Sequence, residues 1–121
     1  MLFTSPHPGT NGKPDFEKVD LKRTWNEAQS YCRENFVDLA SIRNKDENDI
    51  IKGLINENYV WIGLHREKEW SDGSTSLFRH WADGQPNSEN EECVTTEFID
   101  SGQWSDDNCA LRFPFICEIE K

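Results

Sequence analysis

The chain has 121 residues, 35% of them hydrophobic, which is enough for one domain with a single core of moderate size. Its 23 acidic residues outnumber 13 basic ones and give a formal net charge of −10. Nucleic acids and anionic membrane surfaces both bind basic faces, so neither is an expected partner. The excess acid is compatible with a bound cation, and equally with acidity that serves solubility alone.

The N-terminal third predicts a strand and a helix. Residues 1–14 contain three of the five prolines and are expected to form a flexible leader or a segment added for expression. From Phe16, apolar and charged residues alternate, which predicts a first strand. Thr24 and Glu27 have the spacing of a capping box, which predicts that a helix begins there. The apolar positions of that helix are Trp25, Ala28, Tyr31 and Cys32.

A second helix and a short strand are predicted next. Residues 36–42 have the composition of a short strand or extended link. Asn44, with Glu47 three positions on, predicts the cap of the second helix. The expected buried stripe of this helix consists of Ile50, Ile51, Leu54 and Ile55.

The centre of the chain predicts a buried strand followed by a long loop. Residues 59–65 are strongly apolar, which favours a central strand. Residues 71–74 have turn chemistry. Little regular structure is expected from 77 to 90, where Trp81 is the expected anchor of a long loop, and such loops commonly carry binding sites. No stretch is long and apolar enough to predict membrane insertion.

The four cysteines predict disulfides. None lies in a Cys-x-x-Cys pair, and the three histidines (His7, His65 and His80) are scattered, so a zinc site is not expected. Disulfides imply an oxidising compartment, so we expect a secreted or extracellular protein. Four cysteines allow three pairings, and spacing alone does not choose among them.

Two oxygen-rich segments, 85–92 and 105–108, each directly precede a cysteine. A bond between Cys93 and Cys109 would place them side by side at one end of a hairpin, because the intervening residues have strand and turn chemistry. The carboxylates that would crowd there are Glu91, Glu92, Asp106 and Asp107. Crowded carboxylates repel one another unless a cation sits among them, and calcium prefers oxygen ligands of this type.

Seven short motifs, in order along the chain, match those of one family. They are Trp25–Cys32, Leu39–Ile42, Trp61–Leu64, Gln85–Asn87, Glu91–Cys93, Trp104–Asp106 and Phe115–Cys117. In these motifs the chain resembles a C-type lectin-like domain of the short form with two disulfides, and the domain is expected to span 15–121. The resemblance implies an α+β fold, with two helices, antiparallel sheets and a long ligand-binding loop region. It also implies the disulfide pairs Cys32–Cys117 and Cys93–Cys109.

The resemblance further implies a calcium site. In sugar-binding members, the main calcium is held by two residues flanking a cis proline, a Glu before the next cysteine, and an Asn-Asp pair after a Trp. The matching ligand-binding set here is Gln85, Asn87, Glu91, Ser105 and Asp106, of which Gln85, Asn87, Glu91 and Asp106 are the expected metal ligands. Ser105 stands where those members have Asn. Its hydroxyl is a shorter and weaker ligand, so one site with weak Ca²⁺ binding is expected.

The sugar preference implied by the resemblance is mixed. Members with Glu-Pro-Asn prefer mannose-type sugars, and those with Gln-Pro-Asp prefer galactose-type sugars. Gln85 and Asn87 are both amides that donate and accept, which removes the asymmetry, and Asn87 leans toward mannose-type sugars. A second calcium site found in some members is not expected, because Arg66 and Ser88 replace acidic ligands.

Several of the residues considered above also have an ordinary structural interpretation. Trp61, Trp81 and Trp104 are expected to be core anchors. The acidic run at 89–92 is by default a solvated loop face. Pro86 has the alternative of an ordinary turn proline, since only about 5–6% of X–Pro bonds in folded proteins are cis.

Two functions therefore stand side by side. The first is a calcium-dependent carbohydrate-binding module for glycans or glycoproteins, in settings such as innate immunity or cell-surface adhesion. The alternative is a metal-independent lectin-like domain that binds a protein or another non-sugar ligand through the long loop, which the departures at Ser105 and Arg66 motivate. An enzyme is not expected, because the chain has no His-Glu-x-x-His, Gly-x-Ser-x-Gly or phosphate-loop motif.

Overall fold

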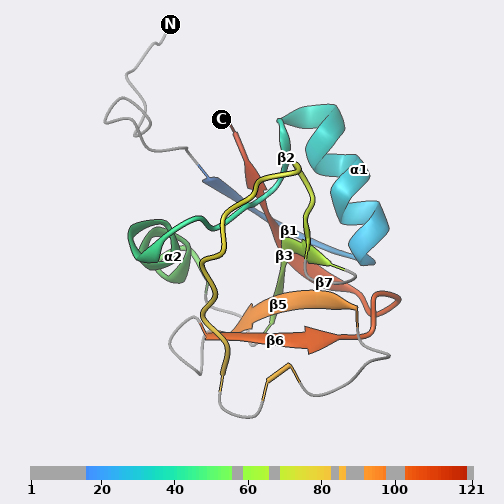
Figure 1. The fold of residues 1–121 in the computed structure, drawn as a ribbon. Helices are drawn as coiled ribbons and strands as arrows, with labels where there is room; N and C mark the ends of the chain where they lie inside the picture. The colour runs from blue at the N-terminus through green and yellow to red at the C-terminus, as the bar shows by residue number, and fades with distance from the viewer. Residues whose placement is uncertain are drawn as a thin grey trace, which may run out of the picture.

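A computed structural model describes residues 16–55, 59–65, 69–82, 85–86, 92–97 and 103–119, so the expected leader lies outside the described residues. Along this part of the chain the elements are β1 (Phe16–Arg23), α1 (Trp25–Asn35), β2 (Asp38–Leu39), α2 (Lys45–Lys52), β3 (Val60–His65), β4 (Glu69–Trp70), β5 (Cys93–Glu97), β6 (Gln103–Asp107) and β7 (Phe113–Glu118). Figure 1 shows α1 and α2 on either side of the strands. Neither described helix has the length and apolar surface that crossing a bilayer requires.

The described strands form one mixed sheet. Its order is β1-β7-β3-β5-β6, with β2 added to β7 and β4 added to β3. Neighbouring strands are antiparallel except β3 and β7, which run parallel where Trp61 lies beside Phe115. The predicted central strand is confirmed, since Val60 to Leu64 are all buried in β3. The α+β fold is likewise confirmed, with one parallel strand pair within the sheet.

Alternation along β3 divides the core between the two faces of the sheet. On one face, Ile62 belongs to a cluster with Ile51 of α2 and Trp104 of β6. On the other face, Trp61 belongs to a cluster with Trp25 of α1 and with the first disulfide. The two helices in Figure 1 thus cover opposite faces of one sheet.

The predicted capping box begins α1. The Thr24 hydroxyl accepts a hydrogen bond from the Glu27 amide at 3.2 Å, and the Glu27 carboxylate accepts one from the Thr24 amide at 3.2 Å. One turn from the end of the helix, Cys32 is joined to Cys117 of β7, as predicted, with 5.3 Å between their Cα atoms. The indole of Trp25 donates to the carbonyl of Ile62 at 2.9 Å. These contacts fix α1 against the central strands.

The buried stripe of α2 differs from the predicted one. Ile51 and Ile55 are buried, as expected, but Ile50 and Leu54 are 37% and 38% exposed. The prediction was wrong for Leu54 because α2 ends at Lys52, so that Leu54 and Ile55 both lie beyond the helix. It was wrong for Ile50 because polar side chains occupy part of the inward face of the helix. One of them is Asn48, which is only 2% exposed.

Gly63 allows two backbone segments to approach closely. Its N–H donates to the carbonyl of Ala40 at 2.8 Å. A Cβ atom at this position would lie 2.8 Å from the Ala40 oxygen and 3.0 Å from the Leu39 oxygen, closer than real contacts allow. The absence of a side chain therefore sets the spacing between β3 and the segment that follows β2.

Replacing Gly63 with alanine should lower the free energy of unfolding by about 2 kcal/mol, since the added methyl group pushes two backbones apart. Gly53→Ala is the matched control, because Gly53 has helical angles and its Cβ would meet only the Ile50 oxygen at 3.4 Å and the Asp49 oxygen at 3.8 Å. That control should be neutral or stabilise by about 0.5 kcal/mol. Urea denaturation measures both variants, and equal losses would contradict the packing argument.

Candidate functional site

The candidate site is built on the hairpin of β5 and β6. Its register runs from Cys93 opposite Asp107 to Glu97 opposite Gln103. The Cys93–Cys109 disulfide, with 5.2 Å between Cα atoms, closes the open end of the hairpin. The hairpin and the second disulfide are therefore both confirmed.

Trp104 attaches the long loop to β6. Its side chain is fully buried, its indole donates to the Asn48 side-chain oxygen at 2.9 Å, and the ring of Trp81 packs edge-on against it with centroids 5.9 Å apart. Its backbone N–H donates to the His80 carbonyl at 2.7 Å, and its carbonyl accepts from the Ala82 amide at 2.8 Å. The predicted core residue thus also positions the loop.

Gln85 is brought onto β6 by this attachment. Its backbone N–H donates to the Ala82 carbonyl at 3.0 Å. Its side-chain Oε1 accepts a hydrogen bond from the backbone N–H of Asp106 at 3.2 Å. The peptide between Gln85 and Pro86 is cis, and Asp106 is only 3% exposed. Two of the expected ligands, 21 positions apart in the chain, are therefore in direct contact.

Ser105 and Asp107 lie on the opposite face of β6, because successive side chains of a strand alternate. The Ser105 hydroxyl lies 3.3 Å from the Thr95 hydroxyl, and Thr95 donates to the Asp107 carboxylate at 3.0 Å. The Ser105 side chain thus faces Thr95 and not Gln85. The expected crowding of Asp107 with Asp106 is wrong for the same reason.

The other two predicted metal ligands are not among the described residues. Asn87 and Glu91 lie outside the described residues, as do Arg66 and Ser88. Glu92 is described and exposed. Within the described ranges, no three His, Cys, Asp or Glu side chains gather closely enough to hold a metal ion.

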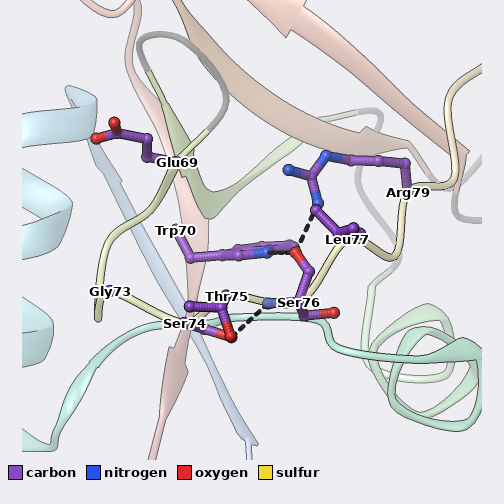
Figure 2. A pocket seen from close by; sticks show the side chains of 8 residues that line it. All are labelled: Glu69, Trp70, Gly73, Ser74, Thr75, Ser76, Leu77 and Arg79. Carbon is purple, nitrogen blue, oxygen red and sulfur yellow. Dashed lines mark hydrogen bonds between the residues drawn. The ribbon is translucent and has the colours of Figure 1, made fainter.

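The long loop begins earlier than the predicted residue 77, because residues 71–80, directly after β4, form no helix or strand. Its first half contains a hollow of about 330 Å³ that was not predicted from the sequence. In Figure 2 the Trp70 ring lies between the loop backbone and Arg79, whose guanidinium carbon is 5.6 Å from the ring centroid. Arg79 also donates to the carbonyls of Ser76 and Phe78 at 3.2 and 2.7 Å. Leu77, on the rim, is 87% exposed. The sequence feature that could have indicated this hollow is a single leucine within a loop rich in serine and threonine.

Comparison with known proteins agrees with this architecture. A family model described as the Lectin C-type domain matches residues 21–119. A lectin from Pleurodeles waltl is 34% identical over 117 residues, an alignment that covers 85% of this chain and 68% of that protein. The chain therefore belongs to the C-type lectin domain family, and it spans about two thirds of the length of that relative.

Solved structures extend the likeness to three dimensions. Human lithostathine superposes with a TM-score of 0.81 at 27% identity, covering 88% of this chain and 91% of that one. The C-type lectin domain of murine dendritic cell inhibitory receptor 2, in complex with N-glycan, has a TM-score of 0.80 at 26% identity and covers 88% and 90%. A calcium-independent type II antifreeze protein has a TM-score of 0.79 at 26% identity and covers 88% and 86%. The same fold therefore occurs in proteins of different binding behaviour.

Asn48→Ala should lower the free energy of unfolding by about 2 kcal/mol, because the buried N–H of Trp104 loses its acceptor. Asn35→Ala is the control, since Asn35 is exposed at the end of α1 and its side chain donates to the Tyr31 carbonyl within the same helix at 3.0 Å. Its effect should stay within about 0.5 kcal/mol. Urea denaturation followed by tryptophan fluorescence measures both, and a neutral Asn48→Ala would contradict the role given to this bond.

Proposed function

We propose that this domain is a calcium-dependent carbohydrate-binding module. The proposal is carried by the hydrogen bond from the Asp106 N–H to Gln85 Oε1, because it joins the long loop to β6 at two of the expected calcium ligands. Asn87 and Glu91 complete the proposed set, which then has two amide and two carboxylate ligands. Two carboxylates balance the charge of the divalent ion.

The chemistry of the donors fits calcium, a hard cation that takes oxygen ligands. Gln85 Oε1 accepts one N–H and retains a second lone pair. Asp106 is nearly buried, so less solvent screens its attraction for a cation than at the surface. Four protein ligands are fewer than the roughly six to eight oxygens that calcium takes, so weak binding is proposed, with water or sugar hydroxyls completing the shell.

The proposed ligands are glycans or glycoproteins, with mannose-type sugars preferred because Asn87 is the second amide of the motif. The support is that one structural neighbour was solved in complex with N-glycan. The two disulfides support a secreted or extracellular location. Roles such as innate immunity or cell-surface adhesion fit such a ligand, and the proposal includes no catalytic step.

Asp106→Asn should weaken calcium binding by about tenfold or more, equivalent to about 1.4 kcal/mol, because it removes one of two ligand charges. Asp107→Asn is the matched control, since it makes the same charge change on the next residue but on the face of Thr95. Calorimetry measures calcium binding, and a glycan screen with and without chelator measures its consequence. If the wild type gives no heat in millimolar calcium, and chelator leaves its glycan signals unaltered, calcium-dependent recognition is excluded.

Gln85→Glu should strengthen calcium binding on the order of tenfold, because affinity at oxygen sites rises with ligand charge. The carboxylate can still accept the Asp106 N–H, so the attachment of the loop is kept. Gln29→Glu serves as the control for a change in net charge, because Gln29 contacts Ser71, away from the candidate site. Unchanged calcium affinity in Gln85→Glu would contradict a metal position beside Gln85.

Metal-independent binding of a protein or other non-sugar ligand is the second candidate function. It is favoured by the hollow beside Trp70 and by the exposed Leu77 at its rim. A calcium-independent protein among the structural neighbours supports it as well. Asp106→Asn separates the two functions, because it should abolish a calcium-mediated interaction and leave a metal-independent one intact.

A further inference from the structure

A buried group of acidic side chains lies at the other end of the long loop, away from Gln85. Glu118, at the end of β7, is fully buried. Its Oε1 accepts from the Ser41 amide at 3.1 Å and from the Arg43 guanidinium at 3.3 Å. Its Oε2 has no hydrogen-bond partner among the described residues. A fully ionised carboxylate with an unpartnered buried oxygen is costly, so this site favours a protonated form.

The guanidinium of Arg43 forms ion pairs with three carboxylates in this group. Arg43 lies 3.0 Å from Asp72, 3.3 Å from Glu118 and 3.5 Å from Glu47, whose side chains are respectively 3%, 0% and 6% exposed. Glu47 is further held by the Arg43 amide at 2.7 Å. Three full negative charges on a single cation would leave an excess of negative charge with little solvent to screen it. A proton on one of the acids removes part of that excess.

The other charged groups near Glu118 have partners elsewhere. Asp38 lies opposite Glu118 in the pairing of β2 with β7, but its carboxylate accepts hydrogen bonds from Arg33 and Ser71. From β1, the described residue opposite Glu118 is Phe16, which carries no charge. The ionisable groups that face Glu118 from the described elements are therefore Arg43 and Asp72, with Glu47 reached through Arg43.

Asp72 holds the first turn of the long loop. Its Oδ1 accepts from the Ser41 hydroxyl at 2.7 Å and from the Ser74 amide at 2.8 Å. Gly73, which lies between Asp72 and Ser74, has a φ of 79°, and this backbone conformation closes the turn. One step on, the Ser76 hydroxyl donates to the Arg43 carbonyl at 2.9 Å. The position of Asp72 thus decides where residues 71–76 sit.

We propose that Glu118 and Asp72 share one proton, and that this proton anchors residues 71–76 of the long loop to β7 and Arg43. With the proton present, the carboxylic acid of Glu118 donates to the Asp72 carboxylate, and Arg43 balances the remaining charge of the pair. When the proton is lost to solvent, two buried carboxylates repel each other across one cation. The loop's first turn is then released from β7.

The two acids differ in how they titrate. The pKa of Glu118 is raised to about 7, chiefly by burial and in smaller part by Asp72, against the opposing effects of the Ser41 amide and Arg43. Burial would raise the pKa of Asp72 too, but hydrogen bonds from Ser41 and Ser74 and the charge of Arg43 lower it below its ordinary value. Near neutral pH, Glu118 is therefore the group that changes charge.

The sign of the pH effect follows from proton binding. The folded protein holds a proton on Glu118 up to a pKa of about 7, whereas the unfolded chain releases it near the ordinary value of 4.5. Between these values the folded state binds more protons, so its stability falls as pH rises. The stability that the proton on Glu118 contributes is fully present below the pKa of the unfolded chain, and it is lost as pH rises through the pKa of the folded protein.

Hydrogen exchange of the wild type, E118Q and E34Q tests the proposal, at pH about 5 and about 8, in chelator so that calcium plays no part. The side chain of E118Q mimics the protonated acid, because its amide donates to Asp72 at every pH. E34Q is the matched control on the exposed face of α1. After correction for intrinsic exchange, protection of the Ser74 amide should fall about tenfold or more between the two pH values in wild type and E34Q. It should stay constant in E118Q.

Equal pH dependence in wild type and E118Q, or protection that does not change with pH in the wild type, would overturn the proposal. Carbon-13 NMR of the Glu118 carboxyl in the wild type gives a second test that needs no variant. A titration midpoint near 7 supports the shared proton, and a midpoint near 4.5 overturns it. Because no step involves calcium or sugar, failure here leaves the proposed lectin function untouched, and the reverse also holds.

Discussion

The attachment of the long loop to β6 through both backbone groups of Trp104 is the constraint on which the candidate site depends. Its bonds to His80 and Ala82 flank a parallel bridge between Trp81 and Trp104, so the loop adds a short strand-like segment to an outer strand of the sheet. Such coverage satisfies backbone groups that an edge strand would leave open. Without this bridge, the described contact between the loop and Asp106 would be reduced to the single hydrogen bond from the Asp106 N–H to Gln85.

Much of the scaffold could be predicted from sequence because its signals are local. The capping box at Thr24 needs only four consecutive residues, and the apolar run in β3 identifies a central strand by composition alone. The predicted stripe of α2 was wrong at Ile50 because tertiary contacts, and not periodicity, decide which of several apolar positions face the sheet. It was wrong at Leu54 because the helix ends earlier than its apolar pattern suggests, at Lys52. Both disulfides formed as the family resemblance implied, although cysteine spacing left three pairings open.

The candidate site was predicted in part. Gln85 and Asp106 meet, but Ser105 and Asp106 looked like one pair of ligands because they are adjacent in the sequence. In a strand, adjacency means opposite faces, so Ser105 faces Thr95. The buried acids were not predicted, because Arg43 lies 29 positions from Asp72 and 75 from Glu118. No local pattern in the sequence indicates that three such segments converge. Both ends of the long loop are thus held by contacts between residues that are distant in the sequence, which explains why neither anchor could be predicted locally.

The pairing of β1 with β7 has a consequence for how the domain is presented. Phe16 lies beside Glu118, and Figure 1 shows that these strand ends lie on the side of the molecule opposite the β5–β6 hairpin. Any tether joined there would leave the hairpin unobstructed. Several copies held by such tethers would face a repetitive target together, and modest individual contacts would combine into avidity without any new interaction.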